Sequence, residues 1–308
     1  MKNKETVRDV IIIGGGPAGL TAAIYSSRSG LDTLVIDNYI TGGQVATCDT
    51  VQNYPGFMQI SGAELSEKFA EQAKKNRAEI IQLEEIKLIE LSENKKEVHM
   101  ADQIFSAKCV IIASGAATIP LPIKDEEKFR GRGIHYCAVC DGALYKGKSV
   151  AVVGSGDSAA DEAYFLSNLA REVIMIVRKD SFKAEKRLLD RIHKKNNIKI
   201  MYNSEIVEAQ GNDKLDTIII KNSKSSNTNR MKIDGVFVYI GSKPNSDLVK
   251  DYVETDEKGY IITDEKMMTS ISGVFAAGDI IVKPFRQITT AVSDGTIAAL
   301  EAERLIVR

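Results

Sequence analysis

Asp9-Val-Ile-Ile-Ile13 runs directly into Gly14-Gly-Gly-Pro-Ala-Gly19, and a stretch with helical character follows from Leu20 to Ser29. The apolar run predicts a buried strand, so the order is strand, glycine turn, helix. Gly14 and Gly16 permit the turn and the approach of the backbone to a pyrophosphate, while Gly19 lets the helix pack near the strand. The segment therefore predicts a dinucleotide site.

A second apolar run supports this interpretation. Thr33-Leu-Val-Ile-Asp37 predicts a strand that ends in a carboxylate eighteen residues after Gly19. A carboxylate at this distance can accept hydrogen bonds from a ribose. The alternative for Asp37 is an ordinary turn residue at a strand end.

The same order of strand, glycine turn and helix is predicted again in the middle of the chain. Ser149-Val-Ala-Val-Val153 and Gly154-Ser-Gly-Asp-Ser-Ala159 predict a strand and a turn, with Ala159 in place of the third glycine. The next strand, Glu172 to Val177, is followed by Arg178 and Lys179, with Lys183 close behind. Cations at the ribose position suit a 2′-phosphate, which favours NADPH over NADH. The alternative is a solvated basic turn, which Asp180 in its midst partly supports.

A pair of cysteines lies between the two loops, in Cys137-Ala-Val-Cys140-Asp141. Two thiols at this spacing can close a small disulfide, and such pairs often have a lowered thiol pKa suited to exchange. The alternative is half of a zinc site, which needs two more Cys or His ligands. The remaining Cys and His residues are isolated in the sequence and offer no matching pair, so we expect no metal.

Length and composition narrow the class of protein. The 308 residues suggest about two domains at roughly 100 to 200 residues each. Forty-one basic and forty-two acidic side chains give a formal charge of −1, which argues against nucleic acid or an anionic membrane as the partner. The N-terminus shows no apolar signal segment, and no run of eighteen apolar residues occurs, so we expect a cytoplasmic protein. In a reducing compartment a Cys-x-x-Cys pair is more often catalytic than structural.

The rest of the pattern indicates how the two nucleotide sites share one chain. We expect an amphipathic helix at 64–78, short strands near 79–91, 96–100 and 103–113, a strand near 273–279 and a final helix at 293–308. The segment 222–229 reads as a polar hairpin loop at most. Pro120, Pro122 and Pro244 mark two crossings between domains, so the second domain is inserted into the first. The expected boundaries are 1–117, 118–244 and 245–308.

Taken together, the motifs resemble the low-molecular-weight thioredoxin reductases, members of the FAD/NAD(P)-dependent pyridine nucleotide-disulfide oxidoreductases. The resemblance covers essentially the whole chain. Besides the two glycine loops and the cysteine pair, it rests on Gly42-Gly-Gln44, Gln52-Asn-Tyr-Pro-Gly56, Gly278-Asp279 and Arg286-Gln287, all in the family's order. It implies an α/β fold with two Rossmann-like, three-layer ββα domains, in which an FAD domain is split by an inserted NADPH domain, and it implies a homodimer.

The resemblance also implies the cofactor contacts. The residues expected at FAD are Gly14, Gly16, Pro17, Ala18, Gly19, Asp37, Gly42, Gly43, Gln44, Asn53, Ala113, Gly115, Gly278, Asp279, Arg286, Gln287 and Ile288. The residues expected at NADPH are Gly154, Gly156, Asp157, Ser158, Ala159, Arg178, Lys179 and Lys183.

The mechanism implied by the resemblance passes electrons from NADPH through FAD and the Cys137–Cys140 disulfide to thioredoxin. Cys140 would face the flavin, Cys137 would attack the partner's disulfide, and Asp141 would act as general acid and base. The alternative role for Asp141 is a helix N-cap or an Asx turn before Gly142. The segments 116–123 and 241–247 would be the hinge between the domains.

The chain departs from the family pattern at three places. Val177-Arg178-Lys179 stands where the family has a histidine and two arginines, Ala143-Leu144 replaces two aromatic residues at the partner's pocket, and His135 stands where small residues are common. For His135 we favour packing over a role in tuning the thiols. Arg132 is a candidate cation for docking thioredoxin, or an ordinary turn residue. Cys48 receives no role, and Cys109 reads as part of a core strand.

Two other functions stay open at this point. The first keeps the flavin and the disulfide but takes electrons from ferredoxin or NADH, or passes them to a thioredoxin-like partner other than thioredoxin. The second is a non-catalytic, nucleotide-binding redox sensor. The intact Cys-x-x-Cys-Asp sequence argues against the sensor.

Overall fold

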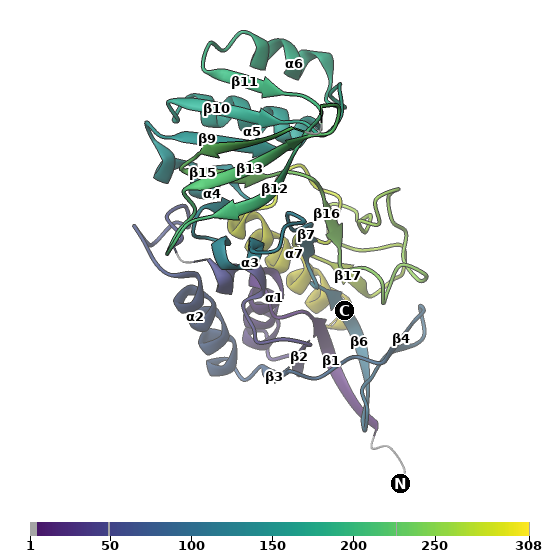
Figure 1. Ribbon diagram of the computed structural model, residues 1–308. Helices are drawn as coiled ribbons and strands as arrows, with labels where there is room; N and C mark the ends of the chain where they lie inside the picture. Colours follow the sequence, from purple (N-terminus) through teal and green to yellow (C-terminus); the bar gives the residue numbers. More distant parts are fainter. Residues whose placement is uncertain (1–4, 49, 226, 308) are drawn as a thin grey trace. The chain divides into compact units, whose positions relative to one another are not determined.

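The computed structural model describes residues 5–48, 50–225 and 227–307 (Figure 1). The chain divides into two compact units. Unit 1 consists of Met1–Ala117 and Lys243–Arg308, and unit 2 consists of Thr118–Ser242. Each unit is built on its own sheet, and each glycine loop predicted from the sequence follows a central strand of one of these two sheets.

Unit 1 contains a seven-stranded sheet with the order β3-β2-β1-β6-β5-β4, and β17 also pairs with β6. Its strands are β1 (Glu5–Ile13), β2 (Thr33–Asp37), β3 (Glu79–Gln82), β4 (Leu88–Leu91), β5 (Lys96–His99), β6 (Ile104–Ile112) and β17 (Val274–Ala276). The pairs among β3, β2, β1, β6 and β17 are parallel, and those among β4, β5 and β6 are antiparallel. The chain thus folds as the α/β class predicted from its sequence.

Both faces of the central strand β1 are buried, which explains its unbroken apolar run. Val10 and Ile12 pack into the cluster that contains the helices, whereas Ile11 and Ile13 pack into a second cluster on the opposite face. Successive side chains of a strand point to opposite faces, so a sheet covered on both sides needs apolar residues at every position.

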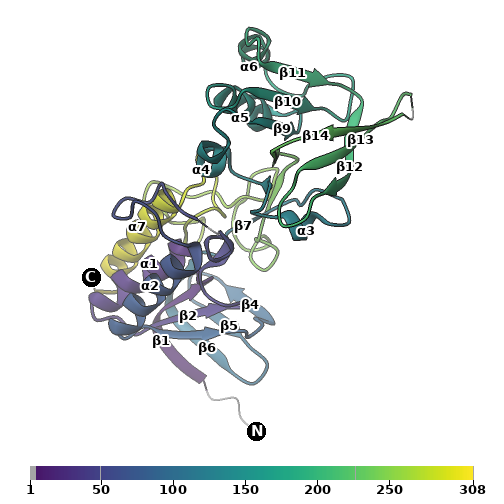
Figure 2. The ribbon, with the colours of Figure 1, turned by 60° about the vertical axis from the view of Figure 1, so that its left-hand side comes forward.

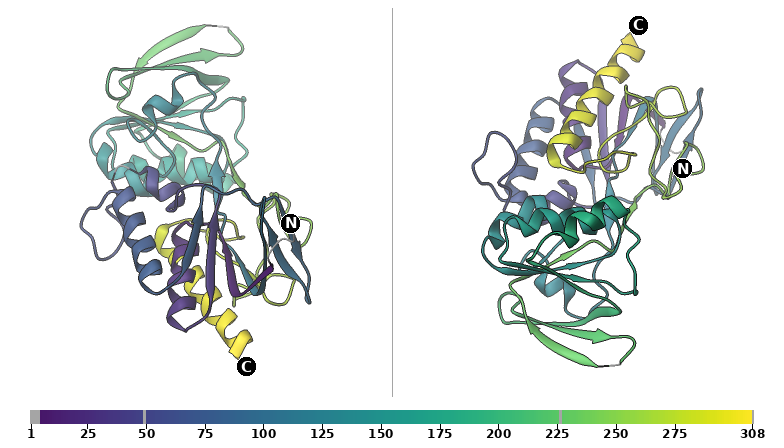
Figure 3. Two further views of the ribbon diagram at one scale, coloured as in Figure 1. Left: turned by 90° about the horizontal axis from the view of Figure 1, so that it is seen from below. Right: turned by 90° about the horizontal axis from the view of Figure 1, so that it is seen from above.

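Three helices cover one face of this sheet. The helical segments of unit 1 are α1 (Pro17–Arg28), η1 (Gly43–Thr47), α2 (Gly62–Lys75) and α7 (Ile288–Val307). Helix α7 runs beside α1 in both views of Figure 3. On the other face, β4 and β5 contribute Ile89 and Val98 to the second cluster. The result is the three-layer ββα arrangement.

Unit 2 repeats the three layers. Its parallel sheet has the order β11-β10-β9-β15-β8, and a separate antiparallel sheet has the order β12-β13-β14. The strands are β8 (Ile134–His135), β9 (Ser149–Val153), β10 (Glu172–Ile176), β11 (Ile198–Met201), β12 (Ser204–Gln210), β13 (Thr217–Asn222), β14 (Thr228–Lys232) and β15 (Gly235–Val238). The helical segments are α3 (Glu126–Phe129), α4 (Ala138–Asp141), η2 (Gly142–Tyr145), α5 (Asp157–Ser167) and α6 (Lys186–His193). Figure 2 shows α5 and α6 against the parallel sheet, with the β13–β14 hairpin projecting on the other side.

The chain crosses between the units twice, and the two crossings pair with each other. Strands β7 (Ala116–Thr118) and β16 (Ser242–Pro244) form a two-stranded sheet. The Ile119 amide donates to the Gly241 carbonyl at 3.0 Å, and the Asn245 amide donates to the Gly115 carbonyl at 2.9 Å. Backbone hydrogen bonds therefore hold the two crossings together at both ends.

Most predicted elements occur, with shifted ends. The predicted helix at 64–78 is α2, which ends earlier, and the predicted final helix at 293–308 is α7, which begins five residues earlier, at Ile288. The polar segment 222–229 forms the turn of the β13–β14 hairpin, as expected, with position 226 outside the described residues. Among the described residues, no helix is long and apolar enough to cross a membrane.

The central strand allows a test of this packing. Replacing Ile12, which is 0% exposed, with Ala leaves a cavity between the sheet and α1, so we expect the free energy of unfolding of unit 1 to fall by about 2–5 kcal/mol. Val7 lies on the same strand but is 62% exposed, and Val7→Ala should change that free energy by less than ~0.5 kcal/mol. Urea unfolding followed by circular dichroism measures both. Equal midpoints for the two variants would contradict the assigned register.

Candidate active site

The first glycine loop lies where the ends of three strands and the start of a helix meet. Gly14 has φ +104°, and a Cβ at this position would lie 2.4 Å from the carbonyl oxygen of Ala113. Its amide donates to the Ile36 carbonyl at 2.8 Å, and the Ala113 amide donates to the Ile13 carbonyl at 2.7 Å. Only glycine combines this φ with this approach, so the loop binds the ends of β1, β2 and β6 together.

The N-terminus of α1 suits an anion. The N-cap residue of α1 is Gly16, whose backbone is extended and which has no side chain to cap the helix. The first turn of the helix contains no acidic residue. A Cβ at Gly16 would meet nothing within 4 Å, so the space in front of the helix is open. Uncapped N–H groups at a helix N-terminus favour a phosphate.

The Asp37 side chain contacts the backbone of this loop. Its Oδ2 accepts a hydrogen bond from the Gly15 amide at 2.6 Å, and its Oδ1 accepts one from the Tyr39 amide at 2.8 Å. Burial raises the pKa of the Asp37 carboxyl, although these two hydrogen bonds act in the opposite direction. Each oxygen keeps a further lone pair that can accept from a ribose hydroxyl.

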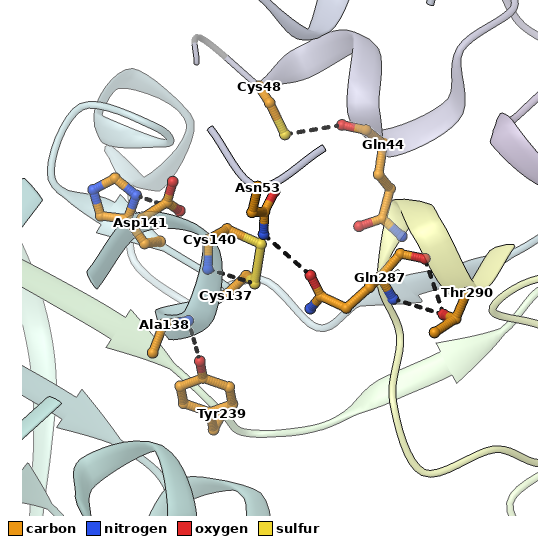
Figure 4. The surroundings of a disulfide bond; sticks show 11 residues. Gln44, Cys48, Asn53, Cys137, Ala138, Cys140, Asp141, Tyr239, Gln287 and Thr290 are labelled. Atoms are coloured by element: carbon orange, nitrogen blue, oxygen red, sulfur yellow. Dashed lines mark hydrogen bonds and ion pairs between the residues drawn. A yellow bond between two sulfur atoms is a disulfide. The ribbon is translucent and has the colours of Figure 1, made fainter. Parts of the chain in front are cut away.

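Other predicted FAD residues gather at the same carboxyl edge of the unit 1 sheet. The Gly42 amide donates to the Gly15 carbonyl at 2.7 Å, which places Gly43 and Gln44 beside the loop. The Gln44 side chain in turn donates to the Ala116 carbonyl. The Asn53 amide group donates to the side-chain oxygen of Gln287 at 3.3 Å (Figure 4). The last of these contacts joins residues that are 234 positions apart in the sequence.

Asp279 follows β17, at the same edge. Its Oδ1 is buried and has no hydrogen-bond partner among the described residues, and burial raises the pKa of the carboxyl. A buried carboxylate oxygen without a partner is costly, and a ligand hydroxyl would remove that cost. Arg286 donates to the carbonyls of Asp279 and Ile281 at 3.3 and 3.2 Å, so it supports the loop that positions Asp279.

The second glycine loop, in unit 2, repeats this geometry. Gly154 has φ +148°, and a Cβ there would lie 2.4 Å from the Tyr239 carbonyl oxygen. Gly156 is the N-cap of α5, which begins at Asp157, and Ala159 is fully buried behind the loop. The small side chain of Ala159 therefore serves where the first loop has Gly19.

The predicted cations lie beside this second loop. The Lys183 amide donates to the Ser155 carbonyl at 2.8 Å, and Ile176, two residues before Arg178, pairs with Val153. Arg178, Lys179 and Lys183 are exposed, and within residues 5–48, 50–225 and 227–307 none of them makes an ion pair. Asp180, which could have neutralised them, lies 3.5 Å from Lys224 instead. The charge is thus available to an anion in front of the loop.

The two cysteines of the predicted pair form a disulfide, with their Cα atoms 5.3 Å apart. Cys137 is the N-cap of the single-turn helix α4, and its sulfur accepts a hydrogen bond from the Cys140 amide at 3.2 Å. The pair follows β8, so it lies at the carboxyl edge of the same parallel sheet that carries the second glycine loop after β9. Ligands of open α/β sheets bind at that edge.

The Asp141 side chain contacts a histidine and does not cap a helix. Asp141 is the N-cap residue of η2 but forms no side-chain cap hydrogen bond. Its Oδ2 lies 3.0 Å from Nδ1 of His135. The packing role favoured for His135 was therefore incomplete, because the buried ring packs and also makes two hydrogen bonds, to Asp141 and to Tyr145.

Sequence reasoning missed two further polar groups in unit 2. Tyr239 Oη accepts a hydrogen bond from the Ala138 amide at 2.6 Å and so fixes the first residue of α4 (Figure 4). Glu162, on α5, is half-buried, and burial raises the pKa of its carboxyl to about 7, with a smaller contribution from Asp161. Neither residue belongs to a motif, since Tyr239 ends an apolar strand and Glu162 sits in an ordinary helix.

Comparison with known proteins identifies the family. Residues 8–295 match the family described as pyridine nucleotide-disulphide oxidoreductase. The chain is 48% identical to the "34.2 kDa protein in rubredoxin operon" of Clostridium pasteurianum over 98% of both chains. It is 41% identical to the thioredoxin reductase of Bacillus subtilis (strain 168), covering 99% of this chain and 96% of that protein.

A solved structure agrees with this result. The thioredoxin reductase from Streptococcus pyogenes MGAS5005 matches with a TM-score of 0.94 and 41% identity over 99% of both chains. A two-unit α/β enzyme fold with a redox disulfide thus defines the class of protein. The chain belongs to the pyridine nucleotide-disulphide oxidoreductase family.

The four cysteines should differ sharply in reactivity. Cys48 is exposed and Cys109 is buried, and burial raises the pKa of the Cys109 thiol to about 11. Because the thiolate is the nucleophile, iodoacetamide at mildly alkaline pH should modify Cys48 and leave Cys109 unmodified. Prior reduction of the protein should add Cys137 and Cys140 to the modified set. Peptide mass spectrometry measures this, and rapid modification of Cys109 in folded protein would contradict its burial.

Proposed function

We propose that this protein is a thioredoxin reductase that passes electrons from NADPH through FAD and the Cys137–Cys140 disulfide to thioredoxin. The observation that carries the proposal is the disulfide at the carboxyl edge of the sheet that also carries the second glycine loop. A disulfide with only a structural role would not need to lie on the same sheet edge as a nucleotide loop. A disulfide that receives electrons from a bound nucleotide does need to lie there.

Unit 1 is the FAD domain in this proposal. The open, uncapped N-terminus of α1 suits the pyrophosphate, Asp37 the adenosine ribose, and Oδ1 of Asp279 a hydroxyl of the ribityl chain. Gly43, Gln44 and Asn53 line the flavin end. When bound, FAD supplies the chemistry that a protein side chain lacks, which is to accept a hydride and pass two electrons to a disulfide.

Unit 2 is the NADPH domain. Gly154 and Gly156 face the pyrophosphate, and Arg178, Lys179 and Lys183 bind the 2′-phosphate. Three exposed cations without an ion pair among the described residues keep the positive charge that the usual histidine and arginines would supply. Their presence favours NADPH over NADH as the donor.

The disulfide chemistry belongs to residues at one end of unit 2. Cys137, after reduction, attacks the disulfide of thioredoxin and breaks its S–S bond, and Asp141 gives a proton to the departing sulfur. Cys140 then attacks the mixed disulfide, so that the Cys137–Cys140 bond forms again and the second thioredoxin sulfur leaves. Tyr239 holds α4 in place through these steps by its hydrogen bond with the Ala138 amide.

The partner surface and the movement between domains complete the proposal. Arg132 and the exposed Leu144 contribute to the surface that receives thioredoxin, where Leu144 offers a smaller apolar contact than an aromatic ring. The paired crossings β7 and β16 are the hinge that lets one flavin serve nicotinamide and disulfide in turn. The enzyme works as a homodimer in the cytoplasm.

Anaerobic titration tests the donor directly. Purified yellow protein is titrated with NADPH and, separately, with NADH, and the flavin absorbance is followed. Bleaching at a modest excess of NADPH, with a larger excess of NADH required, supports the proposal. Bleaching by neither nucleotide would reject NADPH as donor and point to a protein donor such as ferredoxin.

Removing one sulfur separates the two halves of the reaction. Cys140→Ser leaves the nucleotide loops untouched, so NADPH should still bleach the flavin at the wild-type rate. Thioredoxin reduction should be abolished, because the mixed disulfide with Cys137 cannot be resolved. Cys48→Ser is the matched control and should turn over normally. Normal thioredoxin turnover in Cys140→Ser would refute the assigned role of the pair.

The cations beside the second loop should set the choice of nucleotide. Hydrogen bonds to charged groups contribute about 1.5–3 kcal/mol, so Arg178→Ala with Lys179→Ala should lower the NADPH preference over NADH by about 10-fold or more. Lys221→Ala with Arg230→Ala removes the same charge from the exposed β13–β14 hairpin and should leave the preference unchanged. Steady-state kcat/KM for both nucleotides measures the ratio. An unchanged ratio in the first variant would reject the assignment.

A further inference from the structure

The side chain of His135 is held in one plane by two aromatic rings. Only 3% of it is exposed. The imidazole stacks on Phe237, with centroids 5.3 Å apart and planes at 27°, and it meets the Tyr145 ring edge-on, with centroids 5.2 Å apart. Tyr145 in turn packs against bare backbone of β15, because a Cβ on Gly235 would lie 2.4 Å from its ring. A ring packed in this way presents its nitrogens to their neighbours in a fixed direction.

The partners of the two ring nitrogens decide which nitrogen carries the hydrogen. Nδ1 lies 3.0 Å from Oδ2 of Asp141, and Nε2 lies 2.6 Å from the Tyr145 hydroxyl. An ionised carboxylate has no hydrogen to donate, so the hydrogen of the neutral imidazole is on Nδ1. Nε2 then accepts a hydrogen bond from the Tyr145 hydroxyl, whose pKa is raised by burial. Tyr145 thus fixes the tautomer in which an N–H points at Asp141.

The two oxygens of Asp141 differ in their surroundings. Oδ2 accepts the hydrogen bond from Nδ1–H of His135, whereas Oδ1 has no hydrogen-bond partner in the part of the chain that the structure describes. The Asp141 side chain is 26% exposed, so water can reach it. A proton on Oδ2 would point at the hydrogen of Nδ1, whereas a proton on Oδ1 leaves the hydrogen bond intact. The histidine therefore favours Oδ1 as the oxygen that binds a proton.

We propose that His135 is a positioning residue for disulfide exchange, which commits Oδ2 of Asp141 to a hydrogen bond and leaves Oδ1 to exchange the proton. The inference rests on the proposed disulfide reductase function, in which Asp141 is the general acid and base. Asp141 directly follows Cys140 at the end of α4. In each exchange the proton on Oδ1 goes to the departing sulfur, and solvent then returns a proton to Oδ1. The hydrogens of Nδ1 and Tyr145 stay in place, so no proton passes through the ring.

Two substitutions of His135 separate hydrogen bonding from packing. His135→Leu fills much of the space against Phe237 but cannot donate to Asp141. His135→Asn fills that space less well, yet its amide nitrogen lies close to the position of Nδ1 and can donate to Oδ2. A positioning role predicts that the Asn variant is the more active, whereas a role in packing alone predicts that the Leu variant is. His193→Leu, at the exposed end of α6, is the matched control.

The rate is measured on the thiol step itself. Each purified holoenzyme is reduced anaerobically with dithiothreitol, freed of it, and mixed with 2-hydroxyethyl disulfide at neutral pH. The remaining thiols of Cys137 and Cys140 are alkylated at intervals and quantified by mass spectrometry. The thiol that departs from this disulfide has a high pKa and leaves slowly unless it is protonated, so the rate depends on the acid.

The expected result is a loss that the Asn variant largely recovers. General acid catalysis contributes about 10²–10⁴-fold, so His135→Leu should slow exchange by about 10-fold or more. His135→Asn should regain most of that loss, and the control should react at the wild-type rate. A wild-type rate in His135→Leu, or a slower rate in His135→Asn than in His135→Leu, would overturn the proposal.

Removal of the acid gives a stricter test, because a positioning residue acts only through the group that it positions. Asp141→Asn alone should slow exchange at least as much as His135→Leu does. Adding His135→Leu to Asp141→Asn should then cause no further loss, because no acid is left to position. If His135→Leu causes the same fold-loss with and without Asp141→Asn, the histidine acts independently of Asp141 and the proposal is wrong.

These measurements keep the inference separate from the proposed function. Exchange with 2-hydroxyethyl disulfide needs neither NADPH nor thioredoxin, so it tests the positioning role even if wild-type protein fails to reduce thioredoxin with NADPH, which would reject only the proposed function. If thioredoxin is reduced but the His135→Leu variant exchanges at the wild-type rate, only the positioning role is rejected. Anaerobic bleaching of the flavin by NADPH should be the same in His135→Leu and wild-type protein, because hydride transfer does not use Asp141.

Discussion

The close contact of backbone at the two glycine loops is the constraint on which the rest of this structure depends. At Gly14 and at Gly154 a side chain would have to occupy space 2.4 Å from a carbonyl oxygen of the neighbouring strand segment. Because both residues lack a Cβ, each loop can end its central strand, touch the next strand and begin a helix within a few residues. The open N-termini of α1 and α5 result from that geometry, and so does the position of each proposed phosphate site.

The same constraint explains why the glycine loops were predictable from the sequence and the contacts of His135 with Asp141 and Tyr145 were not. A strand, a glycine turn and a helix are consecutive in the chain, so local patterns determine them. His135, Asp141 and Tyr145 also lie within eleven residues, yet no periodicity relates them, because they come from a two-residue strand and two single-turn helical segments. Their contact depends on Phe237 and Gly235, which the fold brings from a distant strand.

Element ends differ from the sequence pattern for reasons that are equally physical. The pattern predicts a final helix from Ser293, but the helix begins at Ile288, because the Thr290 hydroxyl accepts a hydrogen bond from the Gln287 amide and so stabilises an early first turn. Strand β1 begins at Glu5, earlier than the apolar run, because its polar first half pairs with β6 from Ile104 onward. Backbone pairing with a neighbour can therefore extend a strand beyond the apolar residues from which the strand is predicted.

The histidine before the cysteine pair, which departs from the family pattern, is explained by the local structure. Where small residues are usual, the space that His135 needs is found against Phe237 and beside Tyr145, which packs on the bare backbone of Gly235. Burying a polar ring costs free energy unless both ring nitrogens have hydrogen-bond partners. In His135 both have one, because Asp141 and Tyr145 are polar groups that need partners themselves. Asp141 therefore needs no capping role to be held in place, because the histidine orients its carboxylate. A carboxylate held in this way keeps one orientation beside the disulfide, which suits the role of general acid and base proposed for Asp141.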